Sequence, residues 1–164
     1  RLSCVRYGNV IGSRGSVIPV FLEQRKTGKI TITDSRMTRF WISLQMGVQF
    51  VIESLERMRG GEIYVPKIPS MRIMELAEVV APGCEIELVG IRSGEKLHEA
   101  MISADEASRT FEYETFFLIQ PANPVWPEED WTGGTPVPEG FEYSSDANPS
   151  AMSGTELADL IEGL

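Results

Sequence analysis

Histidine and cysteine are scarce in this sequence of 164 residues, which contains one histidine, His98, and two cysteines, Cys4 and Cys84. A metal site built from several imidazoles or from closely spaced thiolates is therefore excluded, and we expect no bound metal. Two isolated cysteines also form no disulfide framework, so we expect reduced thiols and a cytoplasmic protein.

Positive charge is absent from the last third of the chain. Residues 110–164 contain 11 acids and no lysine or arginine, which gives them a net charge of −11. Residues 1–109 hold all 15 basic residues and 13 acids, which leaves a net charge of +2. We therefore expect an anionic ligand to bind the first part, and no nucleic-acid partner for the acidic part.

Long apolar runs and a glycine-rich dinucleotide loop are missing as well. No run approaches the ~18 apolar residues of a membrane-spanning helix, so no membrane segment is expected in this chain. A Rossmann fold carries its glycine-rich fingerprint close to its start. The chain instead opens without a methionine, directly on an apolar strand pattern, LSCVR. We expect that an N-terminal part of a larger fold precedes it.

The elements that are present alternate between strands and helices. Strands are predicted over 2–10, 29–33, 62–66, 85–91 and 110–120, helices over 17–28, 43–59 and 71–80, and a short helix or turn over 94–102. Ser70 is the predicted N-cap of the third helix, and two capping boxes pair Ser103 with Glu106 and Ser153 with Glu156. This alternation predicts an α/β fold, the C-terminal part of an NAD(P)-binding Rossmann fold with a substrate-binding lobe.

Three polar motifs follow expected strand ends, where α/β proteins bind ligands. In RYGNVIGSRGS, glycines allow close backbone approach, and free N–H groups at Ser16 and Val17 suit an anion such as a diphosphate. The alternative is a tight strand-to-helix turn without a ligand.

The second motif, RMTRFW, places Arg36 and Arg39 beside Phe40 and Trp41, so that guanidinium groups can bind phosphate while a ring stacks on a base or sugar. The alternative is an exposed turn anchored by an aromatic residue in the core.

The third motif, GIRSGEKLHE, offers Arg92 for phosphate and Glu95 for ribose hydroxyls. Its alternative is a surface turn with local ion pairs, which contribute little to stability. We expect His98 to be structural, and Lys96 has no apolar surroundings that would make it a base.

Taken together, four segments in this order resemble the C-terminal half of the inverting UDP-N-acetylglucosamine 4,6-dehydratases. The segments are RYGNVIGSRGSVIPVF, ITDSRMTRFWIS, GGEIYVPKIPSM and GIRSGEKLHEAMI. These enzymes are extended short-chain dehydrogenase/reductases of the polysaccharide-biosynthesis group. The resemblance runs from Arg1 to about Gln120 and continues more weakly through FEYSSDANP.

The resemblance implies a role for individual residues. Tyr7 and Gly8 would lie near a tightly held NADP, which is bound mostly outside this chain. The substrate, a UDP-sugar, would contact six residues: Asn9 on the sugar–diphosphate, Ser16 and Val17 along the UDP, and Arg39, Arg92 and Glu95 on the diphosphate and uridine ribose.

The resemblance also implies a reaction and a setting. Hydride leaves C4 of the hexose, water is lost across C5 and C6, hydride returns to C6, and C5 is inverted. The product, a 4-keto-6-deoxy sugar, would feed surface polysaccharide or glycoprotein glycan synthesis. The family tends to form homo-oligomers.

The catalytic Tyr-x-x-x-Lys pair of the family has no counterpart here, because no tyrosine is followed four positions later by lysine. We therefore assign no catalytic residue to this chain and expect it to be inactive alone. A UDP-sugar 4-epimerase of the same superfamily would share these binding motifs, since both enzymes oxidise C4. A non-enzymatic interaction module is the third alternative.

The chain changes character after Gln120, which predicts two regions, 1–120 and 121–164. Six of the ten prolines fall within 121–149, together with Trp126, Trp131, Phe141 and Tyr143. We expect an ordered arm with its aromatic side chains turned inward, ended by a short helix over 153–162.

Overall fold

The computed structural model describes residues 1–122 and 133–162, and its fold divides into two compact units. Unit 1 comprises residues 1–7, 45–67 and 100–144, and unit 2 comprises residues 8–44, 68–99 and 145–164. Because the chain passes between the units several times, each unit is built from segments that are distant in sequence.

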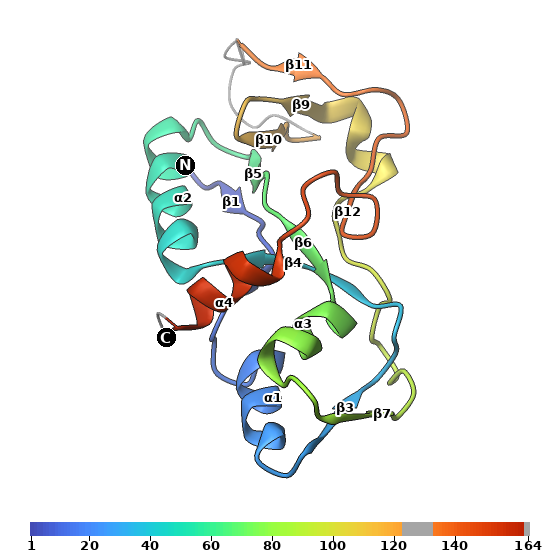
Figure 1. The fold of residues 1–164 in the computed structure, drawn as a ribbon. Coiled ribbons are helices and arrows are strands. Elements are labelled where there is room, and N and C mark those ends of the chain that lie inside the picture. Colours follow the sequence, from blue (N-terminus) through green and yellow to red (C-terminus); the bar gives the residue numbers. More distant parts are fainter. Residues whose placement is uncertain (123–132, 163–164) are drawn as a thin grey trace. The chain divides into compact units, whose positions relative to one another are not determined.

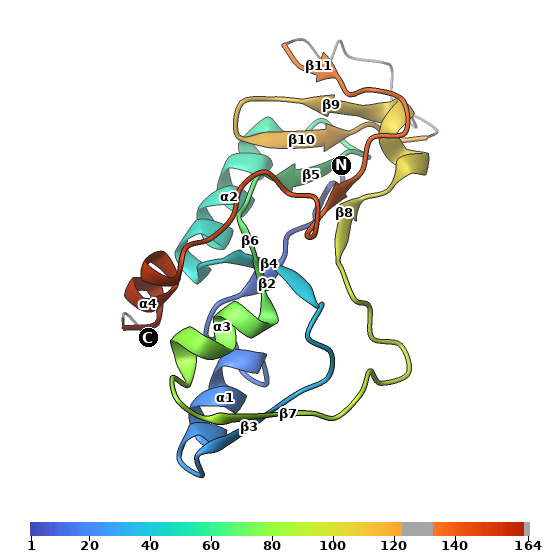
Figure 2. The ribbon, with the colours of Figure 1, turned by 45° about the vertical axis from the view of Figure 1, so that its right-hand side comes forward.

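Unit 1 is organised around a five-stranded sheet (Figure 2). Its strand order is β1-β5-β10-β9-β11, with β1 over Cys4–Val5, β5 over Ile63–Pro66, β10 over Phe116–Ile119, β9 over Thr110–Glu112 and β11 over Thr135–Pro136. The β1–β5 pair is parallel, and the other neighbours are antiparallel. A second, two-stranded sheet pairs β8, Ala100–Ile102, with β12, Tyr143–Ser144, and the 3₁₀ helix η1 covers Ala104–Arg109.

Helix α2, Leu44–Arg57, confirms the predicted helix, and its buried residues are Gly47, Phe50 and Ser54. Phe50 packs with Tyr64, Phe116 and Leu118 of the sheet. The prediction rested on a stripe of apolar residues at spacings of three and four, and four of its five members, Leu44, Val48, Val51 and Leu55, are exposed. The spacing therefore identified the helix but not the side that it buries within the described chain.

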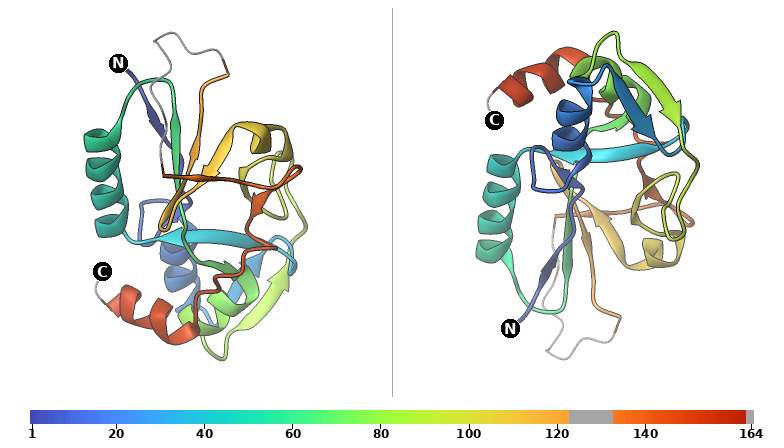
Figure 3. Two further views of the ribbon diagram at one scale, coloured as in Figure 1. Left: turned by 90° about the horizontal axis from the view of Figure 1, so that it is seen from above. Right: turned by 90° about the horizontal axis from the view of Figure 1, so that it is seen from below.

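The described part of unit 2 contains a three-stranded and a two-stranded sheet (Figure 1), and its buried apolar residues form one core cluster. Two parallel pairs join β2, Asn9–Val10, to β4, Thr38–Ile42, and β3, Lys29–Ile32, to β7, Glu85–Leu88. β6, Ser70–Arg72, adds an antiparallel strand to β4. Helices α1, Val17–Arg25, and α3, Ile73–Val80, flank the β3–β7 pair, and α4, Gly154–Glu162, lies beside α3 (Figure 3).

The predicted α/β class is confirmed by these parallel pairs and intervening helices. Five local predictions need correction. The predicted strand over 2–10 is instead two short strands, β1 and β2, which belong to different sheets. Ser70 is not a helix cap, because it pairs with β4 and the helix starts at Ile73. Part of the polar segment 34–41 forms β4, residues 100–102 form a strand after a turn, and 110–120 is a hairpin rather than one strand.

Two of the four aromatic residues of the predicted arm pack inward, against Phe117 of the unit 1 sheet. Phe141 and Tyr143 lie against Phe117, with ring centroids 5.3 and 5.0 Å apart respectively. The predicted terminal helix is present as α4, and Leu157 on it is fully buried. Trp126 and Trp131 lie outside the described residues. No helix in the described ranges is long and apolar enough to cross a membrane.

The capping box at η1 also holds an ion pair that makes unit 1 sensitive to pH. Arg6 donates to both carboxylate oxygens of Glu106, at 3.0 and 3.1 Å, and lowers the pKa of Glu106 from 4.5 to about 2. Because the folded-state pKa lies below the unfolded one, this stabilisation is present above pH 4.5 and is lost as the pH falls toward 2.

We expect Glu106→Gln to lower the free energy of unfolding by about 1–2 kcal/mol at pH 7, a value reduced for the partial exposure of Arg6. Glutamine keeps an acceptor for the Ser103 cap and removes the charge. Urea unfolding at pH 7 and pH 3 measures the difference, which should shrink at the lower pH. An equal difference at both values would contradict the ion-pair explanation.

Candidate functional site

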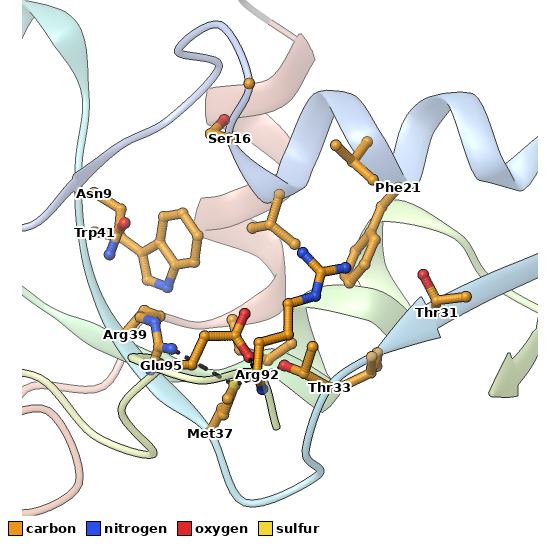
Figure 4. Close-up of a pocket in the computed structure, with 15 residues that line it drawn as sticks. Asn9, Ser16, Phe21, Thr31, Thr33, Met37, Arg39, Trp41, Arg92 and Glu95 are labelled. Carbon is orange, nitrogen blue, oxygen red and sulfur yellow. Dashed lines mark hydrogen bonds between the residues drawn. The ribbon is translucent and has the colours of Figure 1, made fainter. Parts of the chain in front are cut away.

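A cavity of about 390 Å³ lies within unit 2, a volume in the range of small-molecule sites (Figure 4). Its walls come from β2, α1, β3, β4, α3 and the turn around residues 92–95. The lining residues are Asn9, Gly15, Ser16, Val17, Val20, Phe21, Thr31, Ile32, Thr33, Met37, Arg39, Trp41, Ile73, Arg92 and Glu95. All six residues predicted to bind substrate are among them, although they come from three separate motifs.

Close packing of β2 against β4 brings two of these motifs together. Asn9 is the register partner of Trp41 in the parallel pair. A Cβ on Gly8 would lie 2.5 Å from the Cβ of Phe40 and 2.7 Å from its carbonyl oxygen, which is closer than real Cβ contacts. Gly8 is therefore required for the approach of the two strands.

The carboxylate of Glu99 fixes both Asn9 and Arg39. Asn9 donates through Nδ2 to Glu99 Oε2 at 3.0 Å and to the carbonyl of Phe40 at 3.2 Å. Arg39 Nε lies 3.6 Å from Glu99 Oε1. Because these two hydrogen bonds use Nδ2, the amide oxygen Oδ1 is the atom of the Asn9 side chain that is left for other contacts. Sequence reasoning did not single out Glu99, because its partners are distant in sequence.

The guanidinium of Arg39 is used extensively within the chain. Its Nη1 donates to the carbonyls of Thr38 and Leu97, at 2.7 and 3.0 Å, and its Nη2 donates to the carbonyl of Lys96 at 2.9 Å. Nη2 also lies 3.5 Å from Met37 Sδ. Arg39 therefore places a partly buried positive charge at the cavity wall and ties the 96–99 segment to β4.

Arg92 and Glu95 lie on a turn that Glu95 stabilises. Glu95 Oε2 accepts the backbone N–H of Arg92 at 2.9 Å, and the Glu95 N–H donates to the Arg92 carbonyl at 3.1 Å. Within the described chain, the Arg92 guanidinium has no hydrogen-bond or ion-pair partner. Figure 4 shows both side chains extending over the cavity. Arg92 thus offers five donors to a ligand, whereas Arg39 offers mainly charge.

Helix α1 begins at the cavity, as predicted. Ser16 occupies the N-cap position without making a side-chain cap bond, and Val17 is the first helical residue, whose N–H has no intrahelical acceptor. The prediction that the Ser16 N–H is free is wrong, because it donates to the Ser13 carbonyl at 3.1 Å. The Ser16 hydroxyl, however, is buried and has no hydrogen-bond partner among the residues that the structure describes.

Other predicted candidates lie outside the cavity. Arg36 binds Asp34 through two side-chain hydrogen bonds and holds the Asp34 pKa at about 2, so its fork is occupied. His98 is structural, as expected, since Nδ1 lies 2.8 Å from Thr38 Oγ1. Tyr7 is 41% exposed, and neither Tyr7 nor Gly8 lines the cavity.

Two contributors were missed by sequence reasoning. Ser145, in the acidic C-terminal part, bonds through Oγ to Thr38 Oγ1 at 2.7 Å and to the Glu99 N–H at 2.9 Å. Trp41 was considered either as a stacking ring or as an aromatic anchor in the core, and it is 1% exposed and also lines the cavity. In the described ranges, no three His, Cys, Asp or Glu residues are grouped as a metal site.

Comparison with known proteins gives concordant results. The sequence profile described as "Polysaccharide biosynthesis protein" matches residues 1–121. A UDP-N-acetylglucosamine 4,6-dehydratase (inverting) of Campylobacter jejuni is 51% identical over 98% of this chain and 51% of that protein. A UDP-glucose 4-epimerase of Rickettsia conorii is 40% identical over 72% of this chain and 36% of that protein.

The X-ray structure of Pen from Bacillus thuringiensis is similar over 98% of this chain and 49% of that one, with a TM-score of 0.83 and 35% identity. The chain therefore spans about half the length of the relatives that it matches.

The strand contact at Gly8 can be tested by two alanine substitutions. We expect Gly8→Ala to destabilise the protein by about 2–3 kcal/mol, because the backbone of Phe40 cannot move away cheaply. Gly15→Ala is the control, since nothing lies within 4 Å of its Cβ and only its positive φ is strained, at about 1 kcal/mol. Urea unfolding midpoints give the comparison, and equal losses would contradict the packing explanation.

Proposed function

Since the chain belongs to the polysaccharide biosynthesis protein family, we propose that it is the nucleotide-sugar-binding half of an NADP-dependent UDP-N-acetylglucosamine 4,6-dehydratase that inverts C5. The observation that carries the proposal is the cavity itself. It brings Asn9, Ser16, Val17, Arg39, Arg92 and Glu95 together, in a chain 51% identical to such an enzyme.

The charges around the cavity match the parts of a UDP-sugar. Arg92 lies free on its turn and supplies donors for phosphate oxygens, while Arg39 adds positive charge from a fixed position. Glu95 uses one carboxylate oxygen on the turn, so its other oxygen is left to accept from ribose hydroxyls. Asn9 and the start of α1 then border the diphosphate and the sugar.

NADP, when bound, supplies the hydride chemistry of this reaction class. The residues that the structure describes could form only the edge of an NADP-binding site. Tyr7 presents a half-exposed ring and Gly8 is packed against Phe40, so neither forms a cradle for a dinucleotide. We therefore derive no step through the cofactor, and the contacts of Tyr7 and Gly8 with it remain a proposal.

A UDP-sugar 4-epimerase is the second candidate, supported by the 40% identity to a UDP-glucose 4-epimerase. The cavity serves both reactions equally well, because both begin with the same class of substrate. Analysis of the product separates them, since a dehydratase forms a 4-keto-6-deoxy sugar and an epimerase returns a sugar inverted at C4.

The wider setting belongs to the same proposal. We place the protein in the cytoplasm, as a homo-oligomer that supplies surface polysaccharide or glycoprotein glycan synthesis. The support is the family membership together with two cysteines, Cys4 and Cys84, that are free thiols.

In the full-length protein, we expect Arg92→Ala to weaken UDP binding by about 2–4 kcal/mol, because a charged donor is lost from a partly desolvated site. Glu95→Ala should cost about 1–2 kcal/mol. Calorimetry measures both, with Arg36→Ala as a control that removes the same charge outside the cavity. Unchanged UDP affinity in both cavity variants would contradict a binding role and favour the alternative, in which GIRSGEKLHE is only a surface turn.

The 164-residue chain contains the proposed UDP-sugar-binding residues but should not catalyse the reaction alone. We expect no 4-keto sugar above background when this chain is incubated with UDP-N-acetylglucosamine and NADP, because it contains no Tyr-x-x-x-Lys pair. The full-length protein is the positive control. Product formation by the short chain would show that catalytic groups lie within residues 1–164.

A further inference from the structure

The indole N–H of Trp41 is buried and has no hydrogen-bond acceptor within the described chain. The residue is 1% exposed and belongs to the core of unit 2, yet it also lines the cavity. Buried N–H groups in native proteins are almost always paired, so an unpaired one calls for an explanation. Figure 4 shows the nitrogen on the side of the ring that faces Arg39 and Glu95.

The surrounding structure fixes the direction of this N–H. The backbone N–H of Trp41 donates to the Pro69 carbonyl at 2.9 Å, and the residue is paired in register with Asn9. Its ring is packed among core residues that include Met37 and Met71. The indole therefore cannot turn toward water without disrupting the core, and its donor remains directed at the cavity.

Neighbouring donors on the same wall are already in use. Arg39 donates to three backbone carbonyls and pairs with Glu99, and Asn9 Nδ2 donates to Glu99 and to the Phe40 carbonyl. The side-chain donors that line the cavity and are buried without a partner, within the described ranges, are the Trp41 N–H and the Ser16 hydroxyl.

We propose that the Trp41 indole N–H donates a hydrogen bond to a diphosphate oxygen of the bound nucleotide, with the Ser16 hydroxyl as a second neutral donor. This inference rests on the proposed function and adds to it a residue that selects for the diphosphate. An indole N–H can only donate, so its partner must be an acceptor oxygen. The neighbouring charge of Arg39 favours an anionic oxygen over a carbonyl of the base.

The test follows the Trp41 signal in ¹H–¹⁵N spectra of the full-length protein labelled at tryptophan, assigned as the indole signal that Trp41→Phe removes. We expect a downfield shift of this signal on titration with UDP and no comparable shift with uridine. A shift with uridine alone would assign the N–H to the base and overturn the proposal. A stationary signal at saturating UDP would also overturn it.

Affinity measurements give the second readout. Trp41→Phe keeps the ring and removes the donor, so we expect UDP to bind 5- to 10-fold more weakly, which is about the value of one hydrogen bond, with uridine unaffected. Tyr113→Phe, which removes a hydroxyl from a ring that stacks on Phe116 and does not line the cavity, is the control and should bind UDP normally. Ser16→Ala, which leaves the core intact, should also weaken UDP binding; unchanged UDP affinity in both cavity variants would overturn the proposal.

The result also separates this inference from the proposed function. If wild-type protein binds UDP but Trp41→Phe binds it equally well, the donor role is wrong and the nucleotide site stands. If wild-type protein does not bind UDP at all, the proposed function fails and this inference fails with it.

Discussion

The carboxylate of Glu99 is the interaction on which the candidate site depends. It accepts from the Asn9 amide on β2 and pairs with Arg39 on β4, so one side chain joins two strands to the segment that follows the 92–95 turn. Ser145 supports the same segment from the C-terminal part by binding the Glu99 N–H and Thr38. Thr38 and Ser145 are buried and the other members are partly buried. A polar network in such surroundings is stable when each member is satisfied, which makes its geometry specific.

This network explains how three motifs that are distant in sequence form one cavity. The Arg39 guanidinium donates to the carbonyls of Leu97 and Lys96, and these hydrogen bonds hold the segment after the 92–95 turn beside β4. Arg92 on that turn is consequently left free of partners within the described chain. The cavity therefore combines hydrogen-bonded groups on strands with a cation that has no side-chain partner in the described chain.

The sequence predicted those elements whose signals are local. Helix α2 follows from its spacing of apolar residues, and both capping boxes are present because Ser103 and Ser153 meet glutamates three residues later. The short strands β4, β6 and β8 were missed, since strands of three to five residues depend on pairing with distant partners. Ser70 shows how pairing with a distant strand can outweigh a local preference, because a serine that suits a helix cap is here part of strand β6.

The same distinction applies to the site. Charged residues in dense motifs, such as Arg92 and Glu95, were found from the sequence. Glu99 and Ser145 act instead through contacts with each other and with Asn9, Arg39 and Thr38, which span between 46 and 107 positions. Trp41 was the most difficult to interpret, because an aromatic residue in a strand is usually a core residue, and here it is one. Its buried ring, its N–H without an acceptor in the described chain and its place in the cavity wall are the observations from which we propose that this core side chain also faces a ligand. Functional residues of this type are recognised by an unpaired polar atom, which a sequence pattern does not contain.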